Sequence, residues 1–124
     1  MNMIDHEKQI YTLMTNALKE QFDNIQTTNQ KLRFYNETYP VVSIVQTNNY
    51  ELEQSRSFDN NHTLHMEEYE IEIQSDKDMN EIKDIMNQID ISMHQLGYIR
   101  IYCGLDDQDK ETKLKRLMQY KTAL

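Results

Sequence analysis

The sequence predicts an α+β domain, in which about five strands form a mostly antiparallel, possibly mixed sheet and two amphipathic helices pack on one face of that sheet. Three patterns lead to this prediction: a helical stripe within residues 78–100, a strand-like alternation within residues 64–75, and an apolar, β-branched run at residues 41–46. The expected order of elements is α-β-β-β-α-β-β. A chain of 124 residues suits one domain, so residues 1–124 are expected to form a single unit.

The stretch from Asp78 to Arg100 has the strongest periodicity in the chain. Its apolar residues recur at steps of three and four, which places them on one side of an α-helix. They are Met79, Ile82, Ile85, Met86, Ile89, Met93 and Leu96. Asp78 suits the N-cap, and Glu81 completes a capping-box pattern. Gly97 suits the left-handed position that ends many helices, so the stretch predicts a helix, a glycine stop and then a strand.

A first amphipathic helix is expected from Asp5 to Phe22. Its apolar face is expected to hold Ile10, Leu13, Met14, Ala17, Leu18 and Phe22. The polar stretch from Asp23 to Gln30 is expected to be a loop. A short strand is then expected at Leu32, Phe34 and Tyr35.

Proline lacks a backbone donor and belongs at a strand start, so Tyr39-Pro40 marks a break before the next element. The run from Val41 to Gln46 predicts a central strand that is covered on both faces. The last two strands are expected at Tyr98 to Gly104 and at Leu114 to Thr122. The acidic turn that joins them contains Asp106, Asp107, Gln108 and Asp109. The strand before the second helix could pair in parallel with the strand after it, which would make the sheet mixed.

The residues from Leu64 to Ser75 alternate between apolar and acidic side chains. The apolar side is expected to hold Tyr69, Ile71 and Ile73, and the acidic side Glu68, Glu70 and Glu72. A row of like charges costs stability, so a basic partner or a channel to which DNA must not adhere could explain its presence. The alternative is an ordinary solvated sheet face.

The stretch from Thr47 to Thr63 is the longest without a clear pattern. A structureless loop of this length is unusual in a compact domain, so the stretch is either functional or an extended hairpin whose partner lies elsewhere. A plain surface loop is the alternative. Its apolar residues Tyr50, Leu52 and Phe58 could dock on another chain. Together with Arg56 they are the candidates for a subunit interface.

Composition narrows the possible partners. The formal net charge of −8 opposes binding to nucleic-acid phosphates unless a local basic patch outweighs it. The basic residues cluster near the C-terminus at Lys110, Lys113, Lys115, Arg116 and Lys121. The lone cysteine, Cys103, fits a reducing compartment and is expected to be buried. No apolar run suits a membrane span and the N-terminus lacks a signal-peptide core, so folding in cytosol without a membrane partner is expected.

The sequence offers little for catalysis. Two histidines, His62 and His65, have an HxxH spacing, which in an extended segment places them on opposite faces. His6 and His94 are predicted to be isolated helix residues, so no metal site is expected. The carboxylates of Glu67 and Glu68 point to opposite faces of one strand and cannot act on one bond. With two glycines, a backbone cradle for phosphate is hard to build, so neither a cofactor nor enzymatic activity is expected.

Four segments, taken in order, share features with one known family. The first, Tyr39 to Asn49, contains an aromatic-proline pair, a Val-Ser-Ile-Val strand and an asparagine turn. The second runs from Met66 to Lys77, the third from Ile89 to Arg100 and the fourth from Thr112 to Tyr120. In order and spacing they resemble the tail-terminator, or tail-completion, proteins of long-tailed bacteriophages. The residues that carry the resemblance are Pro40, Ser43, Asn49, Tyr69, Ser75, Asp90, Gly97, Arg100, Thr112 and Tyr120.

The resemblance implies a small subunit that assembles into a ring, typically a hexamer. Such a ring caps the tail tube, stops its polymerisation and presents a surface to the filled head. The implied partners are other copies of the chain, the major tail tube protein and a head-completion or connector protein, with DNA only in transit. The implied location is the head-tail junction of the virion, after assembly in the bacterial cytoplasm. The fourth segment departs from the family pattern, because Lys115 and Gln119 stand where arginines are usual.

Within that interpretation, the four candidate interface residues are expected to reach a neighbouring subunit. The acidic row is expected to line the channel or a seam between subunits. Two other readings stay open. One is a different ring component of the head-tail neck, and the other is a small acidic regulator or inhibitor that mimics DNA and acts as a monomer or dimer.

Overall fold

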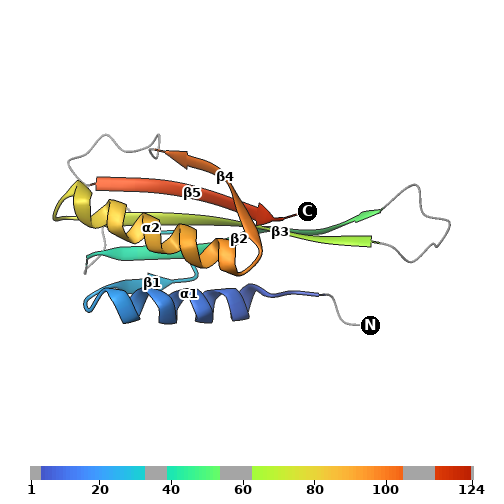
Figure 1. Cartoon of the computed structure of the whole chain (residues 1–124), viewed down its shortest axis with the longest axis horizontal. Helices are drawn as coiled ribbons and strands as arrows, with labels where there is room; N and C mark the ends of the chain where they lie inside the picture. The colour runs from blue at the N-terminus through green and yellow to red at the C-terminus, as the bar shows by residue number, and fades with distance from the viewer. Residues whose placement is uncertain (1–3, 33–38, 54–62, 105–113, 124) are drawn as a thin grey trace.

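The computed structural model describes residues 4–32, 39–53, 63–104 and 114–123, and within them the predicted fold class is confirmed. The elements are α1 (Glu7–Gln21), β1 (Gln26–Thr28), β2 (Val41–Glu53), β3 (Thr63–Ser75), α2 (Met79–Gln95), β4 (Tyr98–Gly104) and β5 (Leu114–Thr122). The strands form one sheet in the order β1-β2-β3-β5-β4 (Figure 1). β1 pairs with β2 in parallel and the other pairs are antiparallel, so the sheet is mixed.

Helix α2 forms as its sequence predicts. The side chain of Asp78 accepts a hydrogen bond from the backbone N–H of Glu81 at 2.8 Å, which satisfies one free amide of the first turn. The predicted stripe faces the sheet and is buried at Ile82, Ile85, Ile89 and Met93. Gly97 adopts a φ of 93°, a left-handed conformation that favours glycine, and the chain turns there into β4.

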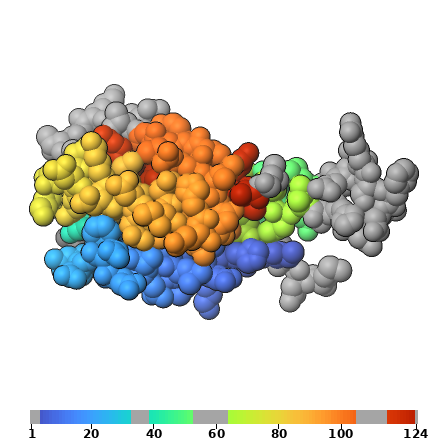
Figure 2. Space-filling model, viewed as in Figure 1, coloured from blue at the N-terminus to red at the C-terminus, as the bar shows by residue number. Residues whose placement is uncertain are grey.

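The core lies between the helices and one face of the sheet. Alternate residues of the three inner strands point to this face, as their register requires. They are Val42 and Ile44 of β2, Tyr69, Ile71 and Ile73 of β3, and Met118 and Tyr120 of β5. Figure 2 shows α1 and α2 lying next to each other over the body of the molecule. The opposite face, which carries Glu68, Glu70 and Glu72, is referred to below as the outer face.

Helix α1 buries a narrower stripe than its sequence predicts. It begins at Glu7, with His6 at the N-cap, and Ile10, Met14 and Leu18 are buried. Leu13, expected on the apolar face, is 41% exposed. The buried residues lie four positions apart, so they follow one line along the helix. α1 contacts α2 and β2 along that line, and Leu13 lies outside it. The prediction that Leu13 belongs to the apolar face is therefore wrong.

The first strand lies elsewhere than predicted. β1 spans Gln26–Thr28, inside the predicted loop, whereas Leu32 belongs to no strand. Phe34 and Tyr35 lie outside the described residues. A parallel pairing with β2 extends β1, and the Gln26 N–H donates to the Pro40 carbonyl at 2.9 Å. The strand is short and polar, and its neighbour Ile25 supplies the buried anchor, so no hydrophobic alternation marks it.

The described part of the patternless stretch continues two strands of the sheet. Residues 47–53 of β2 pair with residues 63–68 of β3, and these two segments are called the arm below. An extra residue interrupts the pairing between Gln46 and Asn48, as in a β-bulge. Figure 1 shows the arm extending beyond the helices. In the described part of the stretch, β2 and β3 are each other's partners, whereas the predicted hairpin had its partner elsewhere. Residues 54–62 lie outside the described residues.

The edge strand β4 is more exposed than expected. Its first residue, Tyr98, is buried, but the residues from Ile99 to Cys103 are exposed. The prediction that Cys103 is buried is therefore wrong. The cause is position: β4 is the last strand of the sheet, with β5 on one side and no described strand on the other. The acidic turn Asp106, Asp107, Gln108 and Asp109 lies outside the described residues.

Replacement of Ile89 by alanine should destabilise the protein by about 2–5 kcal/mol, because it opens a cavity where α2 meets the sheet. Ile91, on the same helix, is 53% exposed and provides the matched control. Its replacement by alanine should change stability by less than about 0.5 kcal/mol. Chemical denaturation of the two variants measures both values. Equal losses would show that α2 does not pack through the predicted stripe.

Candidate functional site and interaction surfaces

Three of the family-motif residues meet at one end of α2. The Tyr120 hydroxyl donates to Asp90 Oδ1 at 2.8 Å, and Arg100 Nη1 lies 3.4 Å from the same oxygen. Burial and the hydrogen bond to Asp90 both raise the pKa of Tyr120, so the phenol stays neutral and donates its proton. Gly97 allows the turn that returns β4 alongside α2. This cluster therefore ties α2 to β4 and β5.

Other motif residues also make contacts within the chain. The hydroxyl of Ser43 donates to the Gln30 carbonyl at 2.7 Å, and that of Ser75 donates to the Glu81 carboxylate at 2.7 Å. Asn49 Nδ2 donates to the carbonyl of Ile4 at 3.1 Å, which holds the N-terminal segment against the arm. Pro40, which follows a cis peptide bond, pairs with β1 as described above. Thr112 lies outside the described residues.

The acidic row lies on the outer face, as the alternation predicts. Glu68, Glu70 and Glu72 are each partly buried. Their cross-strand neighbours on β2 are Asn48, Val45 and Ser43, none of which carries a charge. On β5 the neighbours are Lys121, Gln119 and Leu117, so one lysine lies directly opposite Glu68. Among the described residues directly opposite the row, Lys121 is therefore the one that carries a charge.

The outer face of the arm exposes two large apolar side chains. Tyr50 is 37% exposed and Leu52 is 42% exposed. A hydrogen bond with Glu68 raises the pKa of Tyr50, so the phenol lies beside the end of the acidic row. These two predicted interface residues are accessible to another chain. Arg56 and Phe58, the other two, lie outside the described residues.

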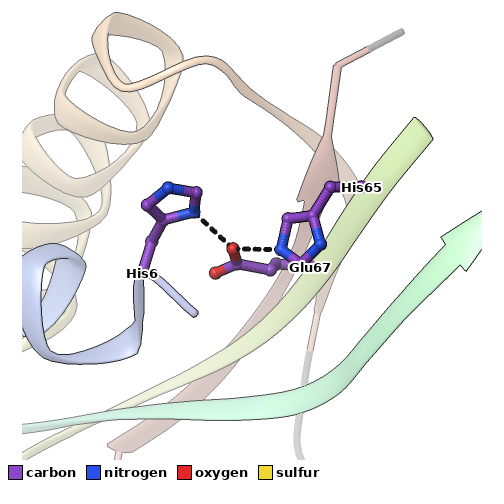
Figure 3. Close-up of side chains that lie close together, drawn as sticks. All are labelled: His6, His65 and Glu67. Carbon is purple, nitrogen blue, oxygen red and sulfur yellow. Dashed lines mark hydrogen bonds and ion pairs between the residues drawn. The ribbon is translucent and has the colours of Figure 1, made fainter. Parts of the chain in front are cut away.

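A further cluster, not expected from the sequence, forms where the N-terminus meets the arm (Figure 3). His6 precedes α1, and His65 and Glu67 point from the same face of β3. His6 Nδ1 lies 2.5 Å from Glu67 Oε2, and His65 Nε2 lies 2.7 Å from the same oxygen. The two imidazole rings meet edge to face with their centroids 5.8 Å apart. The prediction that His6 is isolated is therefore wrong.

Glu67 is the buried centre of this cluster, with 0% of its surface exposed. Its second oxygen, Oε1, accepts hydrogen bonds from the Tyr69 hydroxyl at 2.6 Å and from Gln46 Nε2 at 3.1 Å. Burial by itself would raise the pKa of Glu67. The hydrogen bonds from Tyr69, His6 and His65 outweigh that effect, and the pKa falls below its ordinary value of 4.5. The carboxylate is therefore ionised at neutral pH.

A pocket and a pair of packed tyrosine rings border the cluster. A pocket of about 380 Å³ opens beside it, and its wall includes Gln9, Leu96, Gly97, Tyr98 and Thr122. The ring of Tyr69 packs edge to face on that of Tyr98, with the two ring centroids 5.3 Å apart. Burial raises the pKa of Tyr98 to about 12, and the charge of Glu67 adds to the rise. Both phenols are thus neutral hydrogen-bonding groups beside an ionised carboxylate.

Part of this cluster could have been found in the sequence. His65 and Glu67 are two residues apart on a predicted strand, which places them on one face. His62, the other member of the HxxH pair, lies outside the described residues. His6 lies far from both along the chain, and the sequence has no periodicity that links it to the arm. His94 contacts its own helix, with Nδ1 2.7 Å from the Asp90 carbonyl.

No protein-family model matches this chain, and no curated protein is significantly similar to it. In the part of the chain that the structure describes, neither helix has the length and apolar character needed to cross a membrane.

Replacement of Glu67 by glutamine should destabilise the protein at pH 7 by about 1–3 kcal/mol, because donors aimed at both carboxylate oxygens lose a charged acceptor. The folded-state pKa is lowered, so Glu67 stabilises the protein fully above pH 4.5, and this contribution disappears as the pH falls through the folded-state pKa. Denaturation from pH 7 to pH 3 should therefore show wild type and variant converging in acid. Glu70→Gln, on the outer face, is the control for loss of a carboxylate from β3. A difference in stability between wild type and Glu67→Gln that stayed constant at all pH values would contradict this account.

Replacement of Asp90 by alanine should cost about 1–3 kcal/mol, since the buried Tyr120 hydroxyl loses its acceptor. In a double-mutant cycle with Tyr120→Phe, the two losses should not add, because each removes the same hydrogen bond. Asp84→Ala, at an exposed position of the same helix, controls for loss of a helical carboxylate. Additive losses in the cycle would argue against the pairing of Asp90 with Tyr120.

Proposed function

We propose that this protein is a phage tail-terminator subunit: it forms a ring, caps the tail tube, ends tail polymerisation and joins the tail to the head. The observation that carries the proposal is the arm, a long hairpin extending beyond the core with Tyr50 and Leu52 exposed on its outer face. An exposed apolar surface of this kind suits contact with another protein. The resemblance of the motif segments supplies the identity of the assembly.

A ring needs two different surfaces that fit each other, because its contacts are head-to-tail. The chain offers a second apolar surface on β4, where Ile99, Ile101 and Tyr102 are exposed. This strand is at the edge of the described sheet, so its outer backbone groups can accept a further segment. In the proposed ring, the arm of one subunit docks on the β4 edge of the next.

The acidic row has a place in the same arrangement. It lies on β3, in the middle of the outer face, while the two apolar surfaces lie on the arm and on the sheet edge. If neighbouring subunits contact each other through the outer surfaces, the row lies in the channel or along a seam. A negative lining repels DNA phosphates and lets DNA pass without adhering.

An acidic row is also what a DNA-mimicking regulator would present to a basic enzyme. That reading requires a monomer or dimer, and the exposed apolar arm gives it no support. A different ring of the head-tail neck shares the small size and the ring assembly. Electron microscopy of virions lacking this protein separates this reading from the terminator, since overlong tails indicate loss of a terminator.

The double replacement Tyr50→Ser with Leu52→Ser should prevent ring formation while leaving the fold intact, because both side chains are exposed on the arm. Light scattering at high protein concentration should show rings for wild type and monomers for the variant. Ile91→Ser, which removes an exposed apolar residue from α2, is the matched control and should still form rings. Monomeric wild type under all conditions, including in the presence of tail tubes, would count against the proposal.

A further inference from the structure

We propose that His6, His65 and Glu67 bind a divalent transition-metal ion, with zinc the best fit, and that this ion fastens the N-terminal segment to the arm. This site is independent of the proposed ring function. Its three donor atoms all lie within 4.8 Å of one another, although His6 is far from the other two residues in sequence. Two imidazoles and one carboxylate form a ligand set that zinc accepts.

The geometry needs a small adjustment to admit the ion. A zinc ion bonded at about 2.1 Å to each of three ligands in a tetrahedral arrangement holds their donor atoms about 3.4 Å apart. Both imidazole nitrogens now approach one oxygen of Glu67, at 2.5 and 2.7 Å. Each donor atom must therefore move by less than about 1 Å. His6 can move most easily, because its side chain is 47% exposed and lies before the first turn of α1.

The surroundings favour a charged ion over a purely hydrogen-bonded cluster. Glu67 is fully buried, so a cation beside its carboxylate compensates a charge that is costly to bury. The hydrogen bonds from Tyr69 and Gln46 hold the carboxylate in place through its other oxygen, as outer partners do around bound metals. The pocket beside the cluster leaves room for a water molecule as the fourth ligand.

Binding would have a mechanical consequence. His6 belongs to the segment before α1, whereas His65 and Glu67 belong to β3 (Figure 3). The hydrogen bond from Asn49 to the Ile4 carbonyl already joins the same two parts. A metal ion adds coordinate bonds to that contact, so the segment before α1 should open less often when the ion is bound.

The test is titration of the chelator-treated full chain with Zn²⁺ by calorimetry, and with Co²⁺ by visible absorption. We expect one ion per chain and the intense absorption of tetrahedral cobalt. His6→Gln and His65→Gln should each weaken binding at least about tenfold, since loss of even an outer partner can cost that much. His94→Gln, on α2, is the control and should bind as wild type does.

Hydrogen exchange provides a second readout. Saturation with Zn²⁺ should slow exchange at the backbone amides of residues 4–10 in wild type and in His94→Gln, but not in His6→Gln. If His65→Gln fails to fold, as judged by circular dichroism, His6→Gln decides the question, because its side chain is half exposed. The proposal is overturned if wild type binds no zinc, if His6→Gln binds it as tightly as wild type, or if exchange is unchanged on saturation.

Discussion

The packing of α2 on the sheet is the contact on which the rest of the structure depends. Ile82, Ile85, Ile89 and Met93 are all fully buried against the face that β3 and β5 provide. Fully burying a large apolar side chain stabilises a protein by roughly 1.5–3 kcal/mol, and these four form a continuous stripe along α2. α1 packs against α2, the turn at Gly97 directs β4, and β4 completes the sheet beside β5. The positions of both the N-terminal cluster and the sheet edge thus follow from this helix.

Buried tyrosines donate to carboxylates at two places along the core. Tyr120 donates to Asp90 near the end of α2, and Tyr69 donates to Glu67 at the base of the arm. In each pair burial raises the pKa of the phenol, which stays a neutral donor, while the carboxylate is the charged partner. Hydrogen bonds to charged groups are stronger than those between neutral groups. The bond from Tyr120 to Asp90 fixes α2 to β5, whereas the bond from Tyr69 to Glu67 joins two residues of β3 and orients the Glu67 carboxylate.

The sequence was a good guide where local pattern and tertiary environment agree. The bounds of α2, β4 and β5, the cap at Asp78 and the stop at Gly97 all follow from periodicity and capping chemistry. Prediction failed where partners distant in sequence decide the outcome. β1 is a strand because β2 pairs with it, Cys103 is exposed because β4 is an edge, and Leu13 is exposed because α2 leaves it uncovered. The approach of His6 to Glu67 has the same origin, since only the folded arrangement of α1 and the arm brings them together.

The bulge in β2 determines which side of the arm is apolar. Gln46 pairs with Tyr69 on the helix-covered face, and after one extra residue Asn48 pairs with Glu68 on the outer face. Because side chains alternate along a strand, uninterrupted pairing would have set Tyr50 opposite His65 instead of Met66. Asparagine and glutamate would then occupy the outward positions, and Tyr50 would crowd the two histidines. The one extra residue in β2, Thr47, therefore places Tyr50 and Leu52 on the opposite face of the hairpin from His65 and Glu67.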